Sequence, residues 1–260
     1  MITHNQAKLI GRLKSRKRRE ERRFLVEGVR LVETLIDCQL AVEFFVASPA
    51  LAETARGRRL RETLEAVGSP FFEVGDAELR RLADTENPQG VLAVAHEPER
   101  SLSRFQAPQL SCVLIFDRLA DPGNLGTLVR AGHALGVSLA VALPGTVDPW
   151  SPKVVRASAG SLFRLPVAQE PWSDVAAWLR RHDFAIFCGD RAGEPVGRGG
   201  EAPGRFALVL GNEPSGLSED VRADCDKLLA IELPGGMDSL NVAVAGAILL
   251  DRLLSRPSGT

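Results

Sequence analysis

The feature that most constrains the fold is an alternation of short apolar runs with longer helical stretches in the second half of the chain. It begins at 112–116, an apolar run that is typical of a central strand in a parallel sheet. Further strands are expected at 138–143, 184–188, 206–210 and 228–231, and helices near 125–135, 172–182 and 240–254. Such an alternation predicts an α/β fold in which helices cover both faces of a parallel sheet.

The first half shows a smaller version of the same alternation. Strands are expected at 24–27, 42–47, 70–74 and 90–95, and helices at 28–37, 51–67 and 77–83. The stretch 97–110 carries Pro98 and Pro108 without a clear period, which suits a linker. The sequence therefore predicts a basic arm at 1–23, a small α/β domain at 24–96, a linker at 97–110 and a larger domain at 111–260.

The positive charge of the chain is concentrated near its N-terminus. The formal net charge is only −1, but the lysines and arginines between residues 8 and 23 face only Glu20 and Glu21. A basic segment of this kind is either a solvated helix face or a nucleic-acid contact, and composition leaves both readings open.

Other compositional signals are weak. No apolar run approaches the roughly 20 residues that span a bilayer, and the N-terminus is polar, so a soluble cytoplasmic protein is expected. The four cysteines are widely spaced, and Cys112 and Cys188 lie in apolar runs that are typical of buried strands. We therefore expect core cysteines, with no metal and no disulfide framework.

Three loops that follow predicted strands carry unusual residues, and such loops are where ligands bind in open α/β sheets. In the first, Asp121-Pro122-Gly123 forms a turn, Asn124 is placed to cap the next helix and Arg130 projects from it. The second is glycine-rich and places Glu213 directly after a strand. In the third, Ser239 is placed to cap a small, apolar helix. Each loop read alone is equally typical of an ordinary cap or turn.

Together the three loops resemble the three motifs of the SpoU–TrmH family of RNA methyltransferases, in the same order and near the usual spacing. The matching residues are Asn124, Gly126 and Arg130; Gly211-Asn212-Glu213 and Gly216-Leu217; and Pro234-Gly235 with Ser239-Leu240-Asn241-Val242. The stretch 151–167 is similar to the segment between the first two motifs. The sequence departs from the family pattern at Pro214-Ser215 and at Met237-Asp238.

The first half adds a less specific resemblance. Phe24-Leu25-Val26-Glu27-Gly28 and Asn87-Pro88-Gln89-Gly90-Val91 are similar to the two ends of a substrate-binding domain found in many members that act on ribosomal RNA. That domain resembles a small ribosomal protein. The separate domain favours ribosomal RNA over tRNA as the substrate.

The resemblance implies a trefoil-knotted methyltransferase domain, a homodimer and S-adenosylmethionine as the methyl donor. The implied cofactor contacts are Leu210, Gly211, Asn212, Ile231, Pro234 and Leu240. The implied catalytic residues, which act on a ribose 2′-hydroxyl, are Arg130, Asn124, Glu213, Ser239 and Asn241. The residues expected to contact RNA are Arg16, Arg18, Arg19, Arg22, Arg23 and Arg156. A guanidinium is effectively always protonated, so Arg130 is better suited to stabilise an alkoxide and hold a phosphate than to act as a base.

Three rival functions bear comparison. A Rossmann dinucleotide enzyme needs Gly-x-Gly-x-x-Gly directly after its first strand, and neither Phe24 nor Phe116 is followed by that pattern. A non-catalytic RNA-binding relative would not need the catalytic residues, all of which are present. A tRNA 2′-O-methyltransferase of the same family is the remaining alternative.

Overall fold

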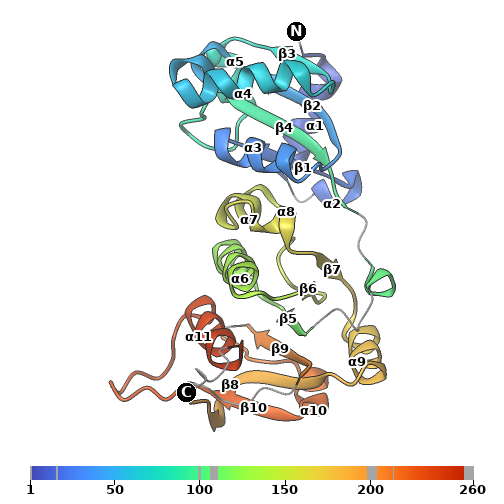
Figure 1. Cartoon of the computed structure of the whole chain (residues 1–260), viewed down its shortest axis with the longest axis vertical. Coiled ribbons are helices and arrows are strands. Elements are labelled where there is room, and N and C mark those ends of the chain that lie inside the picture. The colour runs from blue at the N-terminus through green and yellow to red at the C-terminus, as the bar shows by residue number, and fades with distance from the viewer. Residues whose placement is uncertain are drawn as a thin grey trace, which may run out of the picture. The chain divides into compact units, whose positions relative to one another are not determined.

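The computed structural model describes residues 2–15, 17–98, 101–105, 111–197, 204–212 and 214–254. The chain divides into two compact units, whose elements are labelled in Figure 1. The first comprises Met1–Glu99 and Trp150–Phe163, and the second comprises Arg100–Pro149 and Arg164–Thr260. None of the helices in the described ranges combines the length and the hydropathy that crossing a bilayer requires.

The first unit contains a four-stranded sheet. β1 (Arg23–Glu27) and β2 (Val42–Ala47) both pair antiparallel with β4 (Val91–His96), and β3 (Phe71–Glu73) pairs parallel with β2. The helices are α1 (His4–Leu13), α2 (Arg18–Glu21), α3 (Val29–Asp37), η1 (Pro49–Glu53), α4 (Ala55–Ala66) and α5 (Asp76–Leu82). The single helix expected at 51–67 is divided into η1 and α4, because the side chain of Thr54 caps α4 by accepting from the Gly57 backbone N–H at 3.0 Å.

The N-terminal segment that was expected to be a basic arm forms part of this unit. Thr3 and Gln6 form a capping box that begins α1. One face of the helix carries Ile10 and Leu13, which are fully buried and pack in the core with residues of β1, β2 and β4. The segment is therefore an amphipathic helix with a basic outer face, and its apolar positions anchor it to the sheet.

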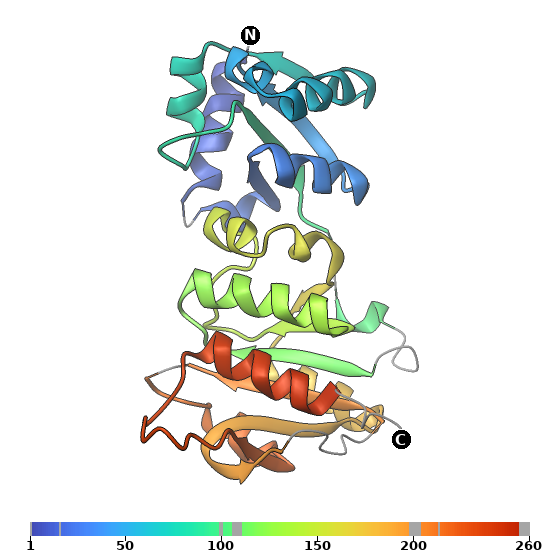
Figure 2. The same ribbon diagram turned by 60° about the vertical axis from the view of Figure 1, so that its left-hand side comes forward.

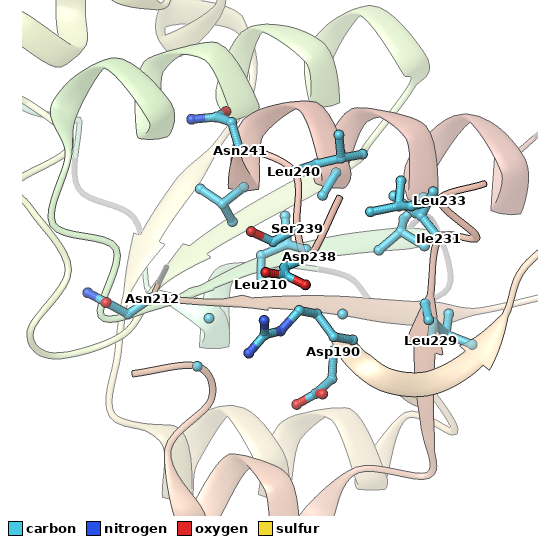
Figure 3. Close-up of a pocket in the computed structure, with 18 of the residues that line it drawn as sticks. Asp190, Leu210, Asn212, Leu229, Ile231, Leu233, Asp238, Ser239, Leu240 and Asn241 are labelled. Atoms are coloured by element: carbon cyan, nitrogen blue, oxygen red, sulfur yellow. The ribbon is translucent and has the colours of Figure 1, made fainter. Parts of the chain in front are cut away.

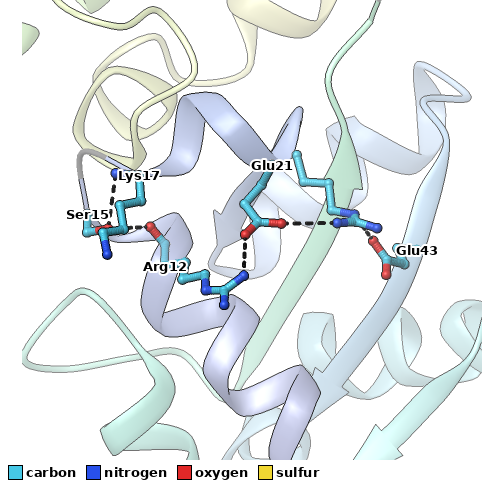
Figure 4. A network of polar contacts seen from close by, with 6 residues as sticks. Arg12, Ser15, Lys17, Glu21 and Glu43 are labelled. Carbon is cyan, nitrogen blue, oxygen red and sulfur yellow. Dashed lines mark hydrogen bonds and ion pairs between the residues drawn. The ribbon is translucent and has the colours of Figure 1, made fainter.

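Not every basic residue of this segment contributes to its positively charged surface, and Arg18 is the clearest example. Its side chain is only 2% exposed, and Nη1 donates to Glu97 Oε2 and to the Arg23 backbone oxygen, both at 3.1 Å. Nearby, Glu21 accepts from Arg12 at 2.8 Å and from Arg23 at 3.3 Å (Figure 4). A buried and paired guanidinium is closed to a phosphate, so the RNA contact predicted for Arg18 is wrong.

A segment from the second half of the sequence completes the first unit. α7 (Pro152–Ala157) and α8 (Ser161–Arg164) form between strands that belong to the other unit. The ring of Phe24 lies 4.7 Å from that of Trp150 and 5.8 Å from that of Phe163, measured between centroids. Arg156 forms an ion pair with Asp84 at 2.8 Å. These contacts tie residues 150–163 to β1 and to the loop before β4.

The second unit contains a six-stranded sheet in which every pair of neighbours is parallel. The strands lie in the order β10 (Lys227–Ala230), β8 (Ala185–Pro195), β9 (Phe206–Gly211), β5 (Cys112–Asp117), β6 (Leu139–Ala142) and β7 (Val167–Gln169). This confirms the predicted parallel sheet. The knot implied by the family resemblance remains a prediction.

Helices cover both faces of this sheet, as predicted. One face packs against α9 (Trp172–Arg181), α10 (Glu219–Asp224) and the short helix η2 (Leu102–Arg104). The other face carries α6 (Pro122–Leu135) and α11 (Val242–Leu254), which run side by side (Figure 2). Gly246 permits this close packing, because a Cβ there would lie 2.5 Å from the side chains of Leu128 and Leu210.

Strand β8 extends well beyond the expected 184–188. The glycine-rich stretch 193–204, whose first residues belong to this strand, reads as a surface loop in the sequence. In the structure Glu194 and Pro195 pair with Leu229 and Ala230 of β10. Gly193 allows this approach, since a Cβ there would lie 2.5 Å from the backbone of Leu228. The extension depends on a partner strand that local sequence does not reveal.

Cys112 and Cys188 are buried in β5 and β8, as expected of core residues. Burial raises the pKa of the Cys112 thiol to about 12 and also raises the pKa of Cys188. Both thiols therefore stay protonated at neutral pH, which makes them inert core groups.

The buried Arg18–Glu97 pair leads to a stability prediction. Arg18→Ala should lower the free energy of unfolding of the first unit by about 3 kcal/mol, because it removes a buried cation that pairs with the Glu97 carboxylate. Chemical denaturation measures the change. Lys8→Ala, at an exposed position of α1, is the control and should change stability by less than about 0.5 kcal/mol. Equal effects of the two substitutions would contradict a structural role for Arg18.

Candidate functional site

A cavity of about 900 Å³ lies in the second unit where β9 and β10 reach their carboxyl ends (Figure 3). Residues 189–191 of β8 form one wall, and the loop that follows β9 forms another. The stretch between β10 and the start of α11 closes the remaining side. Two of the three loops singled out in the sequence therefore line one cavity.

The loop after β9 is held by its own backbone and by Asn212. Asn212 and Gly216 exchange two backbone hydrogen bonds, at 3.2 and 2.8 Å. The side chain of Asn212 donates to the Arg118 backbone oxygen at 2.8 Å, which joins this loop to the one after β5. Gly211 is required here, since a Cβ would lie 2.7 Å from the Gly216 backbone. Asn212 thus lines the cavity but uses its amide to fix the loop.

Asp117 and Arg118 contribute to the same junction and were not assigned a role from the sequence. Asp117 is 2% exposed, and its carboxylate accepts from the Ser218 backbone N–H at 2.6 Å and from Arg118 Nε at 3.2 Å. Arg118 also donates to the Gly216 backbone oxygen at 3.3 Å. The sequence does contain a signal for Asp117, because this carboxylate directly follows a fully apolar strand. An unpaired charge at such a place would lower the stability of the fold.

Asn241 organises the other side of the cavity. Its Oδ1 accepts from the backbone N–H groups of Ala243 at 2.9 Å and Val244 at 3.3 Å, so Asn241 caps α11. Its Nδ2 donates to Asn124 Oδ1 at 2.9 Å. Two residues that lie far apart in the sequence, both predicted to be catalytic, are thereby brought together at the edge of the cavity.

Two predicted helix caps are corrected by this geometry. α6 is capped by Asp121, whose carboxylate accepts from the Asn124 backbone N–H at 2.7 Å, so Asn124 lies inside the first turn. Pro122 occupies the first helical position, which its fixed φ favours. At α11 the cap is Asn241, and Ser239 instead lines the cavity. Because neither side chain serves as the cap, the Asn124 amide can accept from Asn241 and Ser239 lines the cavity.

The predicted site residues fall into three groups. Lining the cavity are Leu210, Gly211, Asn212, Ile231, Ser239, Leu240 and Asn241. Three predicted residues do not belong to the described lining. Pro234 is exposed, and Arg130 lies on an exposed face of α6. Asn124 is connected to the lining through its hydrogen bond with Asn241. Glu213 lies outside the described residues.

Among the other residues predicted to contact RNA, some are exposed and others form ion pairs within the chain. Arg19 and Arg22 are exposed. Arg23 pairs with Glu21 and Glu43, and Arg156 pairs with Asp84. Arg16 lies outside the described residues.

The chemistry of the cavity suits a ligand with an apolar body and a charged end. Leucine, isoleucine and valine side chains line much of it, and four charged residues, Asp190, Arg191, Arg222 and Asp238, lie among them. A cavity of this size that combines apolar side chains with polar groups suits a cofactor site. Within the described ranges, no cluster of three His, Cys, Asp or Glu side chains is arranged to hold a metal ion.

Comparison with known proteins identifies the family of the chain. The family model described as "SpoU rRNA Methylase family" matches residues 111–251. The chain belongs to this family. A second model, "MRM3-like substrate binding domain", matches residues 4–93. Both matches agree with the resemblance seen in the sequence.

Relatives with named activities support the assignment. The chain is 32% identical over 231 residues to the 23S rRNA (guanosine(2553)-2′-O)-methyltransferase RlmP of Bacillus subtilis, covering 88% of each chain. It is 30% identical over 259 residues to the 23S rRNA (uridine(2479)-2′-O)-methyltransferase of Streptomyces viridochromogenes, covering 96% of this chain and 88% of the relative.

Solved structures give the same result. The SpoU methyltransferase AviRb from S. viridochromogenes, in complex with AdoMet, matches with a TM-score of 0.86 and 27% identity over 97% of both chains. An AdoMet-bound rRNA methyltransferase from Sinorhizobium meliloti matches with a TM-score of 0.83 and 29% identity over 96% of this chain and 94% of its own.

The double role of Asn241 can be separated by substitution. Asn241→Ala should lower the stability of the second unit by about 1 kcal/mol, because α11 loses its cap. Asn241→Asp keeps an acceptor for the cap but cannot donate to Asn124 when ionised, so it should retain most of the stability. Urea unfolding measures both variants. Equal losses would show that the cap is not what Asn241 contributes to stability.

Proposed function

We propose that this chain transfers the methyl group of S-adenosylmethionine to a ribose 2′-hydroxyl of ribosomal RNA. The observation that carries the proposal is the cavity at the second and third family motifs, in a fold shared with AdoMet-bound SpoU relatives. Both named relatives are 23S rRNA 2′-O-methyltransferases. Comparing 2′-O-methyl positions in ribosomal RNA with and without the gene tests the proposal, and loss of one position is expected.

The residues of the cavity fit the proposed cofactor. Leu210, Ile231 and Leu240 offer an apolar surface for an adenine ring, and the glycine at 211 leaves backbone groups open to polar edges. S-adenosylmethionine supplies an activated methyl group on a sulfonium. Because the transfer needs no metal and no covalent intermediate, positioning supplies much of the rate acceleration. Pro234 lies outside the lining, so we assign the cofactor contacts to the other predicted residues.

The polar residues beside the cavity suit the handling of a ribose. The Asn241–Asn124 hydrogen bond holds two carboxamides in fixed orientation, and Ser239 adds a hydroxyl. These groups can orient the attacking oxygen toward the methyl group. Arg130 would stabilise the alkoxide that develops on the ribose and hold an adjacent phosphate. Glu213 retains its predicted role in arranging the pocket.

Substitution of Arg130 tests its proposed role. Arg130→Ala should lower methyl transfer on the order of 100-fold, because a preorganised cation is lost from the developing charge. Binding of S-adenosylhomocysteine should be unchanged, since Arg130 does not line the cavity. Arg130→Lys should remain impaired, because lysine lacks the planar fork that binds two oxygens. Normal turnover of the Lys variant would show that a simple positive charge is sufficient.

The outer faces of α6 and α11 support the predicted homodimer. Val244 is 49% exposed on α11, and a groove of about 460 Å³ is lined by Leu135, Ala247, Ile248, Asp251 and Arg252. An exposed apolar surface on paired helices is typical of a protein interface. We infer that a second copy covers it. Since Arg130 points outward from α6, we further infer that it acts on RNA held at the cavity of the second copy.

Ile248→Glu should disrupt this dimer, because it places a carboxylate in the apolar groove. Sedimentation at micromolar concentration should show a monomer that still binds S-adenosylhomocysteine but transfers no methyl group. Val67→Glu, at an apolar position of the first unit that is 40% exposed, is the control and should remain dimeric. A fully active Ile248→Glu monomer would refute both the dimer and the proposed placement of Arg130.

The first unit is proposed to supply RNA affinity. Arg19 and Arg22 are its exposed candidates, and phosphate contacts of this kind position a substrate without reading its sequence. The match of residues 4–93 to a substrate-binding domain supports this division of labour. The trefoil knot in the second unit and a cytoplasmic location stay predictions.

A further inference from the structure

One wall of the cavity contains charged side chains, although an adenosyl group has no charge of its own to pair with them. Asp190 and Arg191 lie on β8, and Arg222 on α10. Asp190 forms an ion pair with Arg222, and its other oxygen accepts from the Ala192 backbone N–H at 2.9 Å. Figure 3 shows the Asp190 carboxylate directed away from Ser239 and Asp238 on the facing side of the cavity. Asp190 and Arg222 therefore satisfy each other's charge.

Arg191 differs from this pair. Arg191 follows Asp190 in the part of β8 where the pairing with β10 shifts register, and it too belongs to the lining of the cavity. Its side chain is exposed and lines the cavity. The facing Asp238 is also exposed and lines the cavity. Among the described residues no ion pair joins the two, so a cation on β8 and an anion on the stretch between β10 and α11 both line the cavity.

We propose that Arg191 binds the carboxylate of the methionyl part of S-adenosylmethionine and that Asp238 faces its ammonium group. This inference rests on the proposed function. An α-amino acid end presents one anion and one cation, which require partners of opposite sign. The predicted cofactor contacts, such as Gly211, Ile231 and Leu240, are backbone or apolar groups and satisfy neither charge. A guanidinium matches a carboxylate in both charge and geometry.

The positions of Asp238 and Arg191 relative to the family motifs also support this assignment. Asp238 lies in Met237-Asp238, one of the two places where the chain departs from the usual family motif. Arg191 lies in the extension of β8, outside the three motifs. We therefore assign recognition of the amino-acid end to residues that do not belong to the family motif pattern, while the motifs hold the adenosyl part.

Two ligands separate the two ends of the cofactor. S-adenosylhomocysteine carries both the adenosyl and the amino-acid parts, whereas 5′-methylthioadenosine lacks the amino-acid part. Calorimetry on the full chain should show that Arg191→Ala weakens S-adenosylhomocysteine about ten-fold, because a charge-assisted hydrogen bond at an exposed site is lost. Affinity for 5′-methylthioadenosine should stay within about two-fold. Arg181→Ala, an exposed arginine of α9 outside the cavity, is the matched control and should change neither.

Two further variants keep the test independent of folding. Arg191→Lys should recover part of the lost affinity for S-adenosylhomocysteine, because the charge is retained. Asp238→Asn should also weaken S-adenosylhomocysteine selectively. Equal weakening of both ligands by Arg191→Ala, or weaker RNA binding with unchanged S-adenosylhomocysteine affinity, would overturn the inference. If the unaltered chain bound neither ligand, the proposed function itself would fail.

Discussion

The parallel pairing of β9 between β5 and β8 is the constraint on which the rest of the second unit depends. It places the ends of these strands at one edge of the sheet, so the loops that follow β5 and β9 meet. A short set of hydrogen bonds then locks the junction, with Asp117 holding Ser218 and Asn212 holding Arg118. Those groups are partly or fully buried, so each hydrogen bond satisfies polar groups that would otherwise lack a partner at a cost in free energy. The wall of the cavity that the loop after β9 forms is therefore held before any ligand binds, which suits a reaction that depends on alignment.

Much of the architecture could be predicted from the sequence because its main signals are local. The apolar run at 112–116 and the glycine that follows α6 define their elements without reference to the rest of the chain. The helix caps could not be assigned with the same accuracy, since Asp121 and Asn124, like Ser239 and Asn241, are equally good capping residues a few positions apart. Choosing between them depends on where the helix enters the packed core. Arg18 was misread for a related reason: the carboxylate that pairs with it, on Glu97, lies beyond the reach of any local pattern.

The candidate site divides in the same way. Glycines and asparagines of the motif loops were named from the sequence through the family resemblance, because each loop alone is equally typical of an ordinary cap or turn. Asp117, Arg118 and the charged residues on β8 were not found, because their significance lies in which distant loops they contact and in which cavity they line. Arg130 was found by resemblance, but its position on the outer face of α6 was not. Because of that position, we propose that Arg130 acts at the cavity of the second copy and not at the cavity of its own chain.

The use of residues 150–163 to complete the first unit has a consequence for how the protein is made. Phe24 leaves the ribosome well before the rings of Trp150 and Phe163 that cover it, which emerge only after β5, α6 and β6 have been synthesised. The first unit therefore remains open on one side until residue 163 has been made, although domains generally fold as units in N- to C-terminal order. Its folding and that of the second unit must overlap in time, and a nascent chain that stalls before residue 150 would expose an aromatic surface to the cell.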